Sequence, residues 1–206
     1  MTFSRLSDLQ LDTLRELSNI GMGHAATALS QLLRRGISLH VPNLTVTDIA
    51  EVPTLLGGAE MVVAGVTLDV LGEARGNILL IFPRESAERL LGALVGQTGS
   101  DPLESPLGAS TLCEVGNILA SAYLTALGQM LQMVLIPSVP RMALDMAGAV
   151  VDAVLIELSQ SGDLALMLET EFHDNEGGPE PIRGHFFLLP DPETLHVILK
   201  TVGEGL

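Results

Sequence analysis

Two long stretches of the chain carry the hydrophobic spacing of an amphipathic helix. Apolar side chains recur every three or four positions in residues 8–34 and again in residues 105–132. The positions that this spacing turns inward are aliphatic with one tyrosine: Leu11, Leu14, Leu17, Ala25, Ala28, Leu29 and Leu32, then Leu112, Val115, Leu119, Tyr123, Ala126 and Met130. We expect two long helices, each packed by one face against a core.

Between and after these helices, the spacing changes to that of strands. Residues 60–70 alternate, and the continuous apolar run at 76–83 is typical of a central strand. In the second half, we expect strands at 150–158 and 164–172, and residues 183–190 resemble residues 75–83. Short helical patterns at 84–95 and 191–202 close the two halves, each with a proline near its start.

The second half of the chain repeats the first at an offset of 98 residues. Residues 12–42 align without a gap on residues 110–140, and twelve of the 31 pairs are identical. We therefore predict an α/β fold built from a pseudo-two-fold duplicated unit of a long helix, three strands and a short helix. The long helices are expected to pack on a mainly antiparallel sheet. Residues 1–206 would form a single domain from two repeats, 1–100 and 101–206, with the seam at 96–106.

Composition and charge narrow the classes of function. The formal net charge of −15 argues against nucleic acid or an anionic membrane surface as a partner. The N-terminus lacks the apolar run of a signal peptide, and no apolar run is long enough to cross a membrane. We expect a cytoplasmic protein without membrane insertion. The single cysteine, Cys113, excludes an intrachain disulfide and is expected to be a small buried hydrophobe.

The polar faces of the two predicted helices carry the same acid and amide at the same spacing. Glu16 and Asn19 lie one turn apart, opposite the apolar face, and Glu114 and Asn117 occupy the equivalent positions. Solvent-facing residues drift after a duplication with little penalty, so this recurrence favours a shared function. Small side chains continue the same faces: Gly23, Ala26, Thr27 and Ser30, then Ser121, Thr125 and Gly128 with Leu124 beside them.

This pattern resembles the motif of the CheC/CheX/FliY family of chemotaxis phosphatases, and of its CheC branch in particular. The motif has Asp or Ser, then Glu, Asn and Pro at fixed spacing. It occurs twice, as Asp12, Glu16, Asn19 and Pro42 and as Ser110, Glu114, Asn117 and Pro140. The resemblance implies hydrolysis of the aspartyl phosphate of the response regulator CheY. It implies that each Asn orients the attacking water and that each Glu pairs with a regulator lysine. We hold the flanking Asp, Ser and Pro positions to be motif support.

The residue types suit that chemistry. Phosphoryl transfer to water is catalysed mainly by positioning and charge stabilisation, so a neutral amide that both donates and accepts hydrogen bonds can suffice. The required Mg²⁺ is expected on the regulator. The five histidines form no recognisable ligand pair, so we predict no metal site and no cofactor of the chain's own.

Two other interpretations remain. The resemblance extends to adaptors, since the family includes members that bind the receptor deamidase CheD. In that case the Glu/Asn faces would bind phosphorylated CheY without turnover, and residues 145–160 would be the first place to look for a CheD surface. The remaining interpretation is a duplicated α/β domain without catalysis.

Overall fold

The computed structural model describes residues 8–33, 36–96, 101–158, 164–174 and 181–204. The first repeat contains α1 Asp8–Leu33, β1 Ile37–Asp48, the 3₁₀ turn η1 Ile49–Glu51, α2 Val52–Leu55, β2 Val62–Gly72, β3 Gly76–Pro83 and α3 Arg84–Val95. The second contains α4 Pro106–Leu131, β4 Leu135–Pro137, β5 Arg141–Met146, α5 Ala147–Leu158, β6 Leu164–Asp174, β7 Ile182–Pro190 and α6 Pro192–Glu204. Residues 97–100 of the predicted seam lie outside the described ranges.

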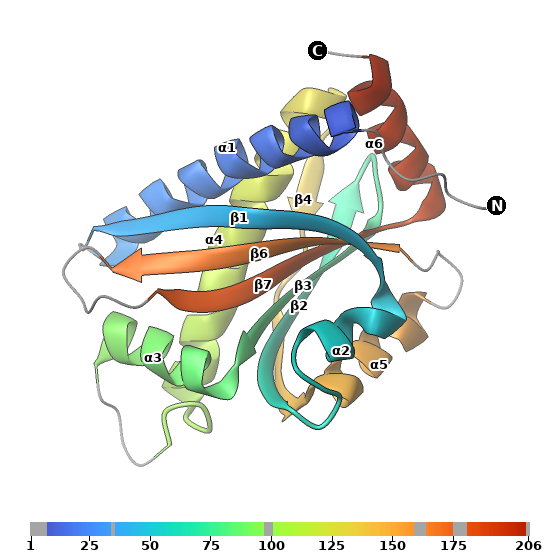
Figure 1. Ribbon diagram of the computed structural model, residues 1–206. Helices are drawn as coiled ribbons and strands as arrows, with labels where there is room; N and C mark the ends of the chain where they lie inside the picture. Colours follow the sequence, from blue (N-terminus) through green and yellow to red (C-terminus); the bar gives the residue numbers. More distant parts are fainter. Residues whose placement is uncertain (1–7, 34–35, 97–100, 159–163, 175–180, 205–206) are drawn as a thin grey trace.

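The described strands form one curved sheet (Figure 1) in the order β1-β6-β7-β3-β2-β4, with β5 also paired to β2. All of these pairings are antiparallel. The order is symmetric about the β7–β3 pair, and β1 corresponds to β4 and β5 taken together. The predicted α/β class with an antiparallel sheet and packed long helices is confirmed. The repeats are also intertwined, because β1 pairs with β6 of the other repeat and β2 pairs with β4 and β5.

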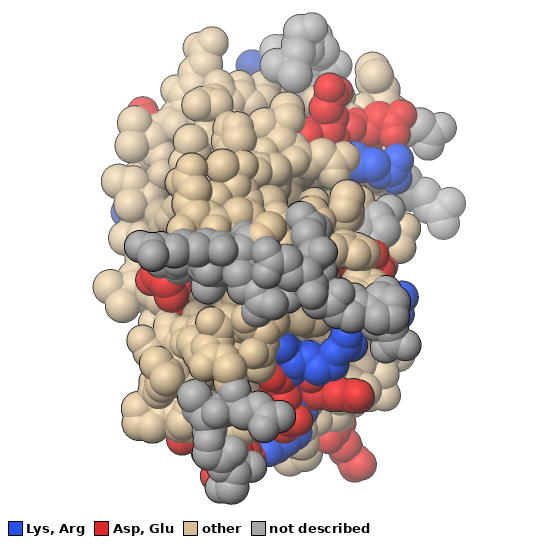
Figure 2. Space-filling view, turned by 90° about the vertical axis from the view of Figure 1, so that its left-hand side faces the viewer, with Lys and Arg blue, Asp and Glu red and all other residues tan. Residues whose placement is uncertain are grey.

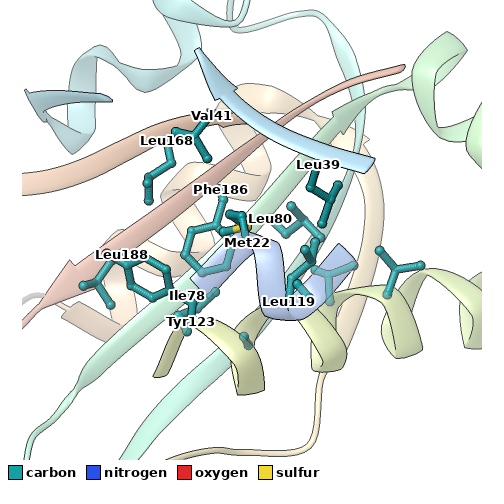
Figure 3. Packing of buried hydrophobic residues seen from close by; sticks show 14 of the residues in the cluster. Met22, Leu39, Val41, Ile78, Leu80, Leu119, Tyr123, Leu168, Phe186 and Leu188 are labelled. Atoms are coloured by element: carbon teal, nitrogen blue, oxygen red, sulfur yellow. The ribbon is translucent and has the colours of Figure 1, made fainter. Parts of the chain in front are cut away.

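One core lies between the sheet and the helices α1, α3, α4 and α6. Its centre is aliphatic with a few aromatic rings, as Figure 3 shows around Met22, Leu80, Leu119 and Phe186. The rings of Tyr123 and Phe186 lie 5.0 Å apart between their centroids. Burial of apolar side chains is the main stabilising contribution to a fold, and here it determines which faces of the two long helices point inward.

The inward-facing positions predicted for the two long helices are largely confirmed. Leu14, Leu17, Ala25 and Leu29 are buried, but Ala28 is exposed. Leu124, which we expected beside the outer face of α4, is fully buried. The buried face of α4 is broader than predicted because this helix is covered by α1 as well as by the sheet. The two helices approach closely, since a Cβ added to Gly21 of α1 would lie 3.1 Å from the Cα of Tyr123 in α4.

A second core lies on the other face of the sheet, under α2 and α5. The strand that we predicted at 150–158 is wrong, because this segment belongs to the helix α5. Its buried positions are Ala147, Val150, Val151 and Val154, which is helical spacing, and they pack on Val63, Leu79 and Phe187. The helix therefore packs on both repeats, since Val63 and Leu79 belong to the first and Phe187 to the second, and α2 shares this core with it (Figure 1).

Candidate functional site

The helix α4 begins at a well-formed N-terminal cap. The Ser105 hydroxyl accepts a hydrogen bond from the Gly108 N–H at 2.9 Å, and Pro106 occupies the first turn, where a missing N–H costs nothing. The helix ends where Gln132 adopts a left-handed conformation with φ of 56°. These ends fix the axial position of the residues between them, including the predicted acid and amide.

An open surface pocket of about 330 Å³ lies along the outer face of α4. Its lining comes from α4, from the last residue of β4 and from the segment that follows it: Ser110, Cys113, Glu114, Asn117, Pro137, Ser138, Val139 and Pro140. Glu114 and Ser110 are exposed and Asn117 is half-buried, so both polar groups of the predicted site reach the surface. We call this the second-repeat pocket. The structure thus brings together all four predicted residues of the second motif.

The first motif lies on the outer face of α1. Asp12, Glu16 and Asn19 are all exposed, and Asp12 forms an ion pair with Arg15 at 3.3 Å, an exposed pair of small energetic value. A hollow of about 550 Å³ lies further along α1, lined by Gly23, Ala26, Thr27, Ser30, Gln31, Ile37, Ser38 and Leu39. Its lining includes the predicted run of small residues, of which Gly23 and Thr27 are exposed and Ala26 and Ser30 are half-buried. It does not include the acid and the amide.

The prolines of the two motifs occupy an irregular point in the strand that follows each long helix. Pro42 lies in β1, where the register with β6 shifts between His40 and Asn43. Pro140 lies at the interruption between β4 and β5, and its side chain lines the second-repeat pocket. A proline cannot donate a hydrogen bond to a neighbouring strand, so both positions suit an interruption at a sheet edge.

Sequence patterns did not identify the wall of the second-repeat pocket. Pro137, Ser138 and Val139 belong to no recognisable motif, and they meet α4 only because the chain turns back after Gln132. Cys113 also differs from expectation, since it is half-buried and lines the pocket. Burial raises the pKa of the Cys113 thiol, which keeps it protonated and weakly nucleophilic.

The described residues contain no cluster of three or more His, Cys, Asp or Glu side chains that could hold a metal ion. Within the same ranges, no helix has both the length and the apolar character needed to cross a bilayer. Figure 2 shows one face of the molecule, on which acidic and basic side chains lie together along one edge. On this face, the net negative charge therefore does not produce a surface of a single sign.

Comparison with known proteins places the two motifs within one family. The sequence model of the CheC-like family matches residues 9–46 and 107–143. The CheY-P phosphatase CheC of Bacillus subtilis is 38% identical over 207 residues, which cover 99% of both chains. This chain belongs to the CheC-like family. A CheC1 protein of Halobacterium salinarum is 24% identical over 94% of this chain and 96% of its own length.

The CheC-like fold is also seen in a solved structure. The crystal structure of Thermotoga maritima FliY superposes with a TM-score of 0.78 over 98% of this chain and 100% of that one, at 16% sequence identity. At this identity the likeness concerns the fold. Both segments matched by the CheC-like family model contain a full copy of the Glu/Asn motif, so family membership is carried by the same residues that form the surface features above.

Proposed function

We propose that this CheC-like protein is a phosphatase that accelerates hydrolysis of the aspartyl phosphate of the response regulator CheY. The observation that carries the proposal is the Glu/Asn pair that reaches the surface at equivalent positions of two long helices and lines an open pocket in the second repeat. The 38% identity to a protein named CheY-P phosphatase CheC supports it.

The catalytic group that we assign is the side-chain amide of Asn19 and of Asn117. An amide held on a helix can accept a hydrogen bond from a water and donate one to a phosphoryl oxygen, which fixes the water in line with phosphorus. Orientation of this kind lowers the barrier because the entropy of aligning the reactants has already been lost on binding. The half-buried position of Asn117 restricts its rotation, which suits this role.

The carboxylates of Glu16 and Glu114 are assigned to docking. Each lies one helical turn before its amide and is exposed, so it can pair with a lysine of the regulator beside the phosphorylated aspartate. Among the described residues, the lining of the second-repeat pocket contains no basic side chain, which favours a cationic partner for Glu114. Pro42 and Pro140 are assigned to the strand interruption. Asp12 and Ser110 lie inside α1 and α4, four residues after the first helical position, so they support the motif from within the helix and do not cap it.

We further propose that the chain supplies no metal. The Mg²⁺ required for phosphoryl transfer would belong to the regulator, where it would neutralise charge on the phosphoryl oxygens. The protein would work in the cytoplasm, where response regulators are phosphorylated.

Turnover tests this proposal. CheY carrying a ³²P-labelled aspartyl phosphate is mixed with Mg²⁺ and a small molar fraction of the protein, and labelled phosphate release is followed. We expect each protein molecule to release many phosphates and the rate to scale with protein concentration. Decay at the rate of CheY alone would contradict the proposal.

A second candidate is an adaptor that binds phosphorylated CheY and the receptor deamidase CheD. The observation that favours it is the outer face of α5, where Ile156 is 75% exposed and Ala149, Asp152 and Ala153 are also exposed. This helix lies on the opposite face of the sheet from α4, so a partner there would leave the second-repeat pocket accessible.

Co-purification separates the two candidates. Immobilised CheD is incubated with the protein, with and without phosphorylated CheY, and bound protein is measured. Retention that depends on phosphorylated CheY, together with no catalytic release of phosphate, would favour the adaptor. If the protein is an adaptor, an Ile156→Asp substitution should abolish its retention on CheD. If the protein is a phosphatase, the same substitution should leave phosphate release unchanged.

A further inference from the structure

Val139 is an apolar side chain in an unusual position. It is 83% exposed, the largest exposure among the large apolar side chains of the described residues, and it lines the second-repeat pocket beside Glu114 and Asn117. A single exposed valine is ordinary on a protein surface. One that borders a pocket with an acid and an amide has the arrangement of a contact residue at an interface, where an apolar group lies next to the groups that give specificity.

The segment that carries Val139 is held firmly. The Ser138 N–H donates to the Asp69 carbonyl at 2.9 Å, and the Asp69 N–H donates to the Ser138 hydroxyl at 2.8 Å. Pro137 and Pro140 flank the segment and restrict its backbone. Because the backbone is already ordered, a partner that covers Val139 loses little conformational entropy on binding.

The first repeat provides an internal comparison. The residue equivalent to Val139 is Val41, which is also a valine but is only 6% exposed and belongs to the main core. Val41 lies in the continuous strand β1, whereas Val139 lies in the interruption between β4 and β5. The break in the edge strand therefore releases in one repeat a side chain that the other repeat uses for packing.

We propose that Val139 is a binding residue for the phosphorylated receiver domain of CheY at the second-repeat pocket. The inference rests on the proposed function for the identity of the occupant. The argument for that occupant is continuity, since Val139 lines the same pocket as Asn117 and a protein that brings a phosphoryl group to this amide must lie over the pocket rim. Burial of Val139 would add affinity next to the polar contacts without taking part in the chemistry.

Steady-state kinetics test the proposal in an Asn19→Ala background, where turnover reports the second-repeat pocket alone. In this background, Val139→Ser should raise KM for phosphorylated CheY about tenfold, because burial of the valine side chain no longer contributes to binding. The value of kcat should not change. Val139→Ile, which keeps the apolar contact, should restore the parent KM. An unchanged KM in Val139→Ser, or a loss confined to kcat, would overturn the proposal.

A matched control lies three residues earlier in the chain. Ile136 is 53% exposed on β4, but it pairs with Leu71 and alternates with Leu135, which packs on the main core, so it projects from the opposite face of the sheet. Ile136→Ser should leave KM at the parent value. An equal rise in KM for Ile136→Ser would show that any apolar loss on this edge has the same effect, and it would overturn the assignment of Val139.

Direct binding separates this inference from the proposed function. CheY loaded with beryllofluoride and Mg²⁺ mimics the phosphorylated form and cannot be hydrolysed. In the Asn19→Ala, Glu16→Ala background, which weakens the first site, Val139→Ser should raise Kd for this probe about tenfold. Such weakening without any phosphatase activity would support the binding surface and refute the enzyme. Activity with an unchanged Kd would support the enzyme and refute the role of Val139.

Discussion

At the scale of single residues, the proposed chemistry depends on a neutral side chain at position 117. Asn117 is half-buried in the second-repeat pocket, beside the exposed carboxylate of Glu114. A second carboxylate there would be repelled by the dianionic phosphoryl group and would lose the amide's donor. The functional requirement is therefore for an amide, and a polar side chain of the same size does not satisfy it.

Replacement of Asn117 by aspartate tests this requirement. In the Asn19→Ala background, Asn117→Asp should lower kcat for CheY dephosphorylation roughly a hundredfold, the scale of loss when a reacting group is misplaced. The fold should be unchanged because the substitution is nearly isosteric. Single-turnover decay of labelled CheY measures the effect, and activity within a few-fold of the parent would contradict the assigned role.

His185 links the stability of the fold to pH. Burial lowers its pKa below 6.5, with Glu169 opposing and Arg183 reinforcing the shift, and its Nδ1 is buried without a hydrogen bond within the described residues. As the pH falls below 6.5, the unfolded chain takes up a proton that the folded state binds only at lower pH. Stability should therefore fall on acidification.

A His185→Leu variant isolates this contribution. Its free energy of unfolding, measured by urea titration, should decrease less between pH 7.5 and pH 5.5 than that of the unsubstituted protein. The two proteins share the same carboxylates, so comparing how steeply the free energy of unfolding changes with pH isolates the contribution of His185. Equal slopes would show that His185 titrates alike in the folded and unfolded states.

The sequence placed single residues well where periodicity decides the side of a helix. The exposure of Glu16, Asn19 and Glu114 follows from the angle between them and the apolar positions. The pocket wall at Val139 and the half-buried Cys113 were not predictable in this way. Both depend on where the chain goes after Gln132, a tertiary feature that local spacing does not contain.

At the scale of elements, the contact between α1 and α4 sets how closely the two long helices approach. Gly21 is buried against α4, and a Cβ there would lie 3.1 Å from the backbone of Tyr123. Gly23, two residues later, is exposed and has nothing within 4 Å of the same hypothetical atom. Because Tyr123 is fully buried, α4 has little room to shift.

Alanine substitution of each glycine should have opposite effects on stability. Gly23→Ala should stabilise the protein by about 1 kcal/mol through helix propensity. Gly21→Ala should destabilise it by roughly 1–2 kcal/mol, because the strain of overpacking against a helix backbone exceeds that gain. Urea unfolding of both variants measures the difference. Similar stabilisation in the two would show that the helices separate easily at this contact.

The helix α5 shows where element prediction from sequence failed. Its β-branched and continuous apolar residues favoured a strand, yet Val150, Val151 and Val154 have the spacing of one helical face. Short apolar runs fit both interpretations, and the choice here is made by the need to cover Val63 and Leu79 on the second face of the sheet. The elements with clear ends were predicted closely, such as α3 at Arg84–Val95.

At the scale of the whole molecule, the two repeats are joined through the sheet. Of the six described strand pairings, those of β1 with β6, β2 with β4, β2 with β5, and β3 with β7 connect one repeat to the other. The sequence revealed the duplication but not this exchange, because a repeat detected by alignment carries no information about which copy supplies the neighbouring strand.

Separate expression of the repeats tests whether residues 1–206 form one domain. Fragments 1–100 and 101–206 should each lack a cooperative unfolding transition, since each loses the partners of its edge strands and exposes core residues. An equimolar mixture should recover helical circular dichroism and a cooperative transition. Independent cooperative unfolding of either fragment would show that the repeats are separate domains.

The duplicated molecule has two equivalent helix faces, and we propose that each presents a water-orienting amide to a phosphoryl group on another protein. The direct measurement is the decay of phosphorylated CheY with the unsubstituted protein, with Asn19→Ala, with Asn117→Ala and with the double variant. We predict accelerated decay with the unsubstituted protein and decay at the rate of CheY alone with a folded double variant. Full acceleration by the folded double variant would contradict the account.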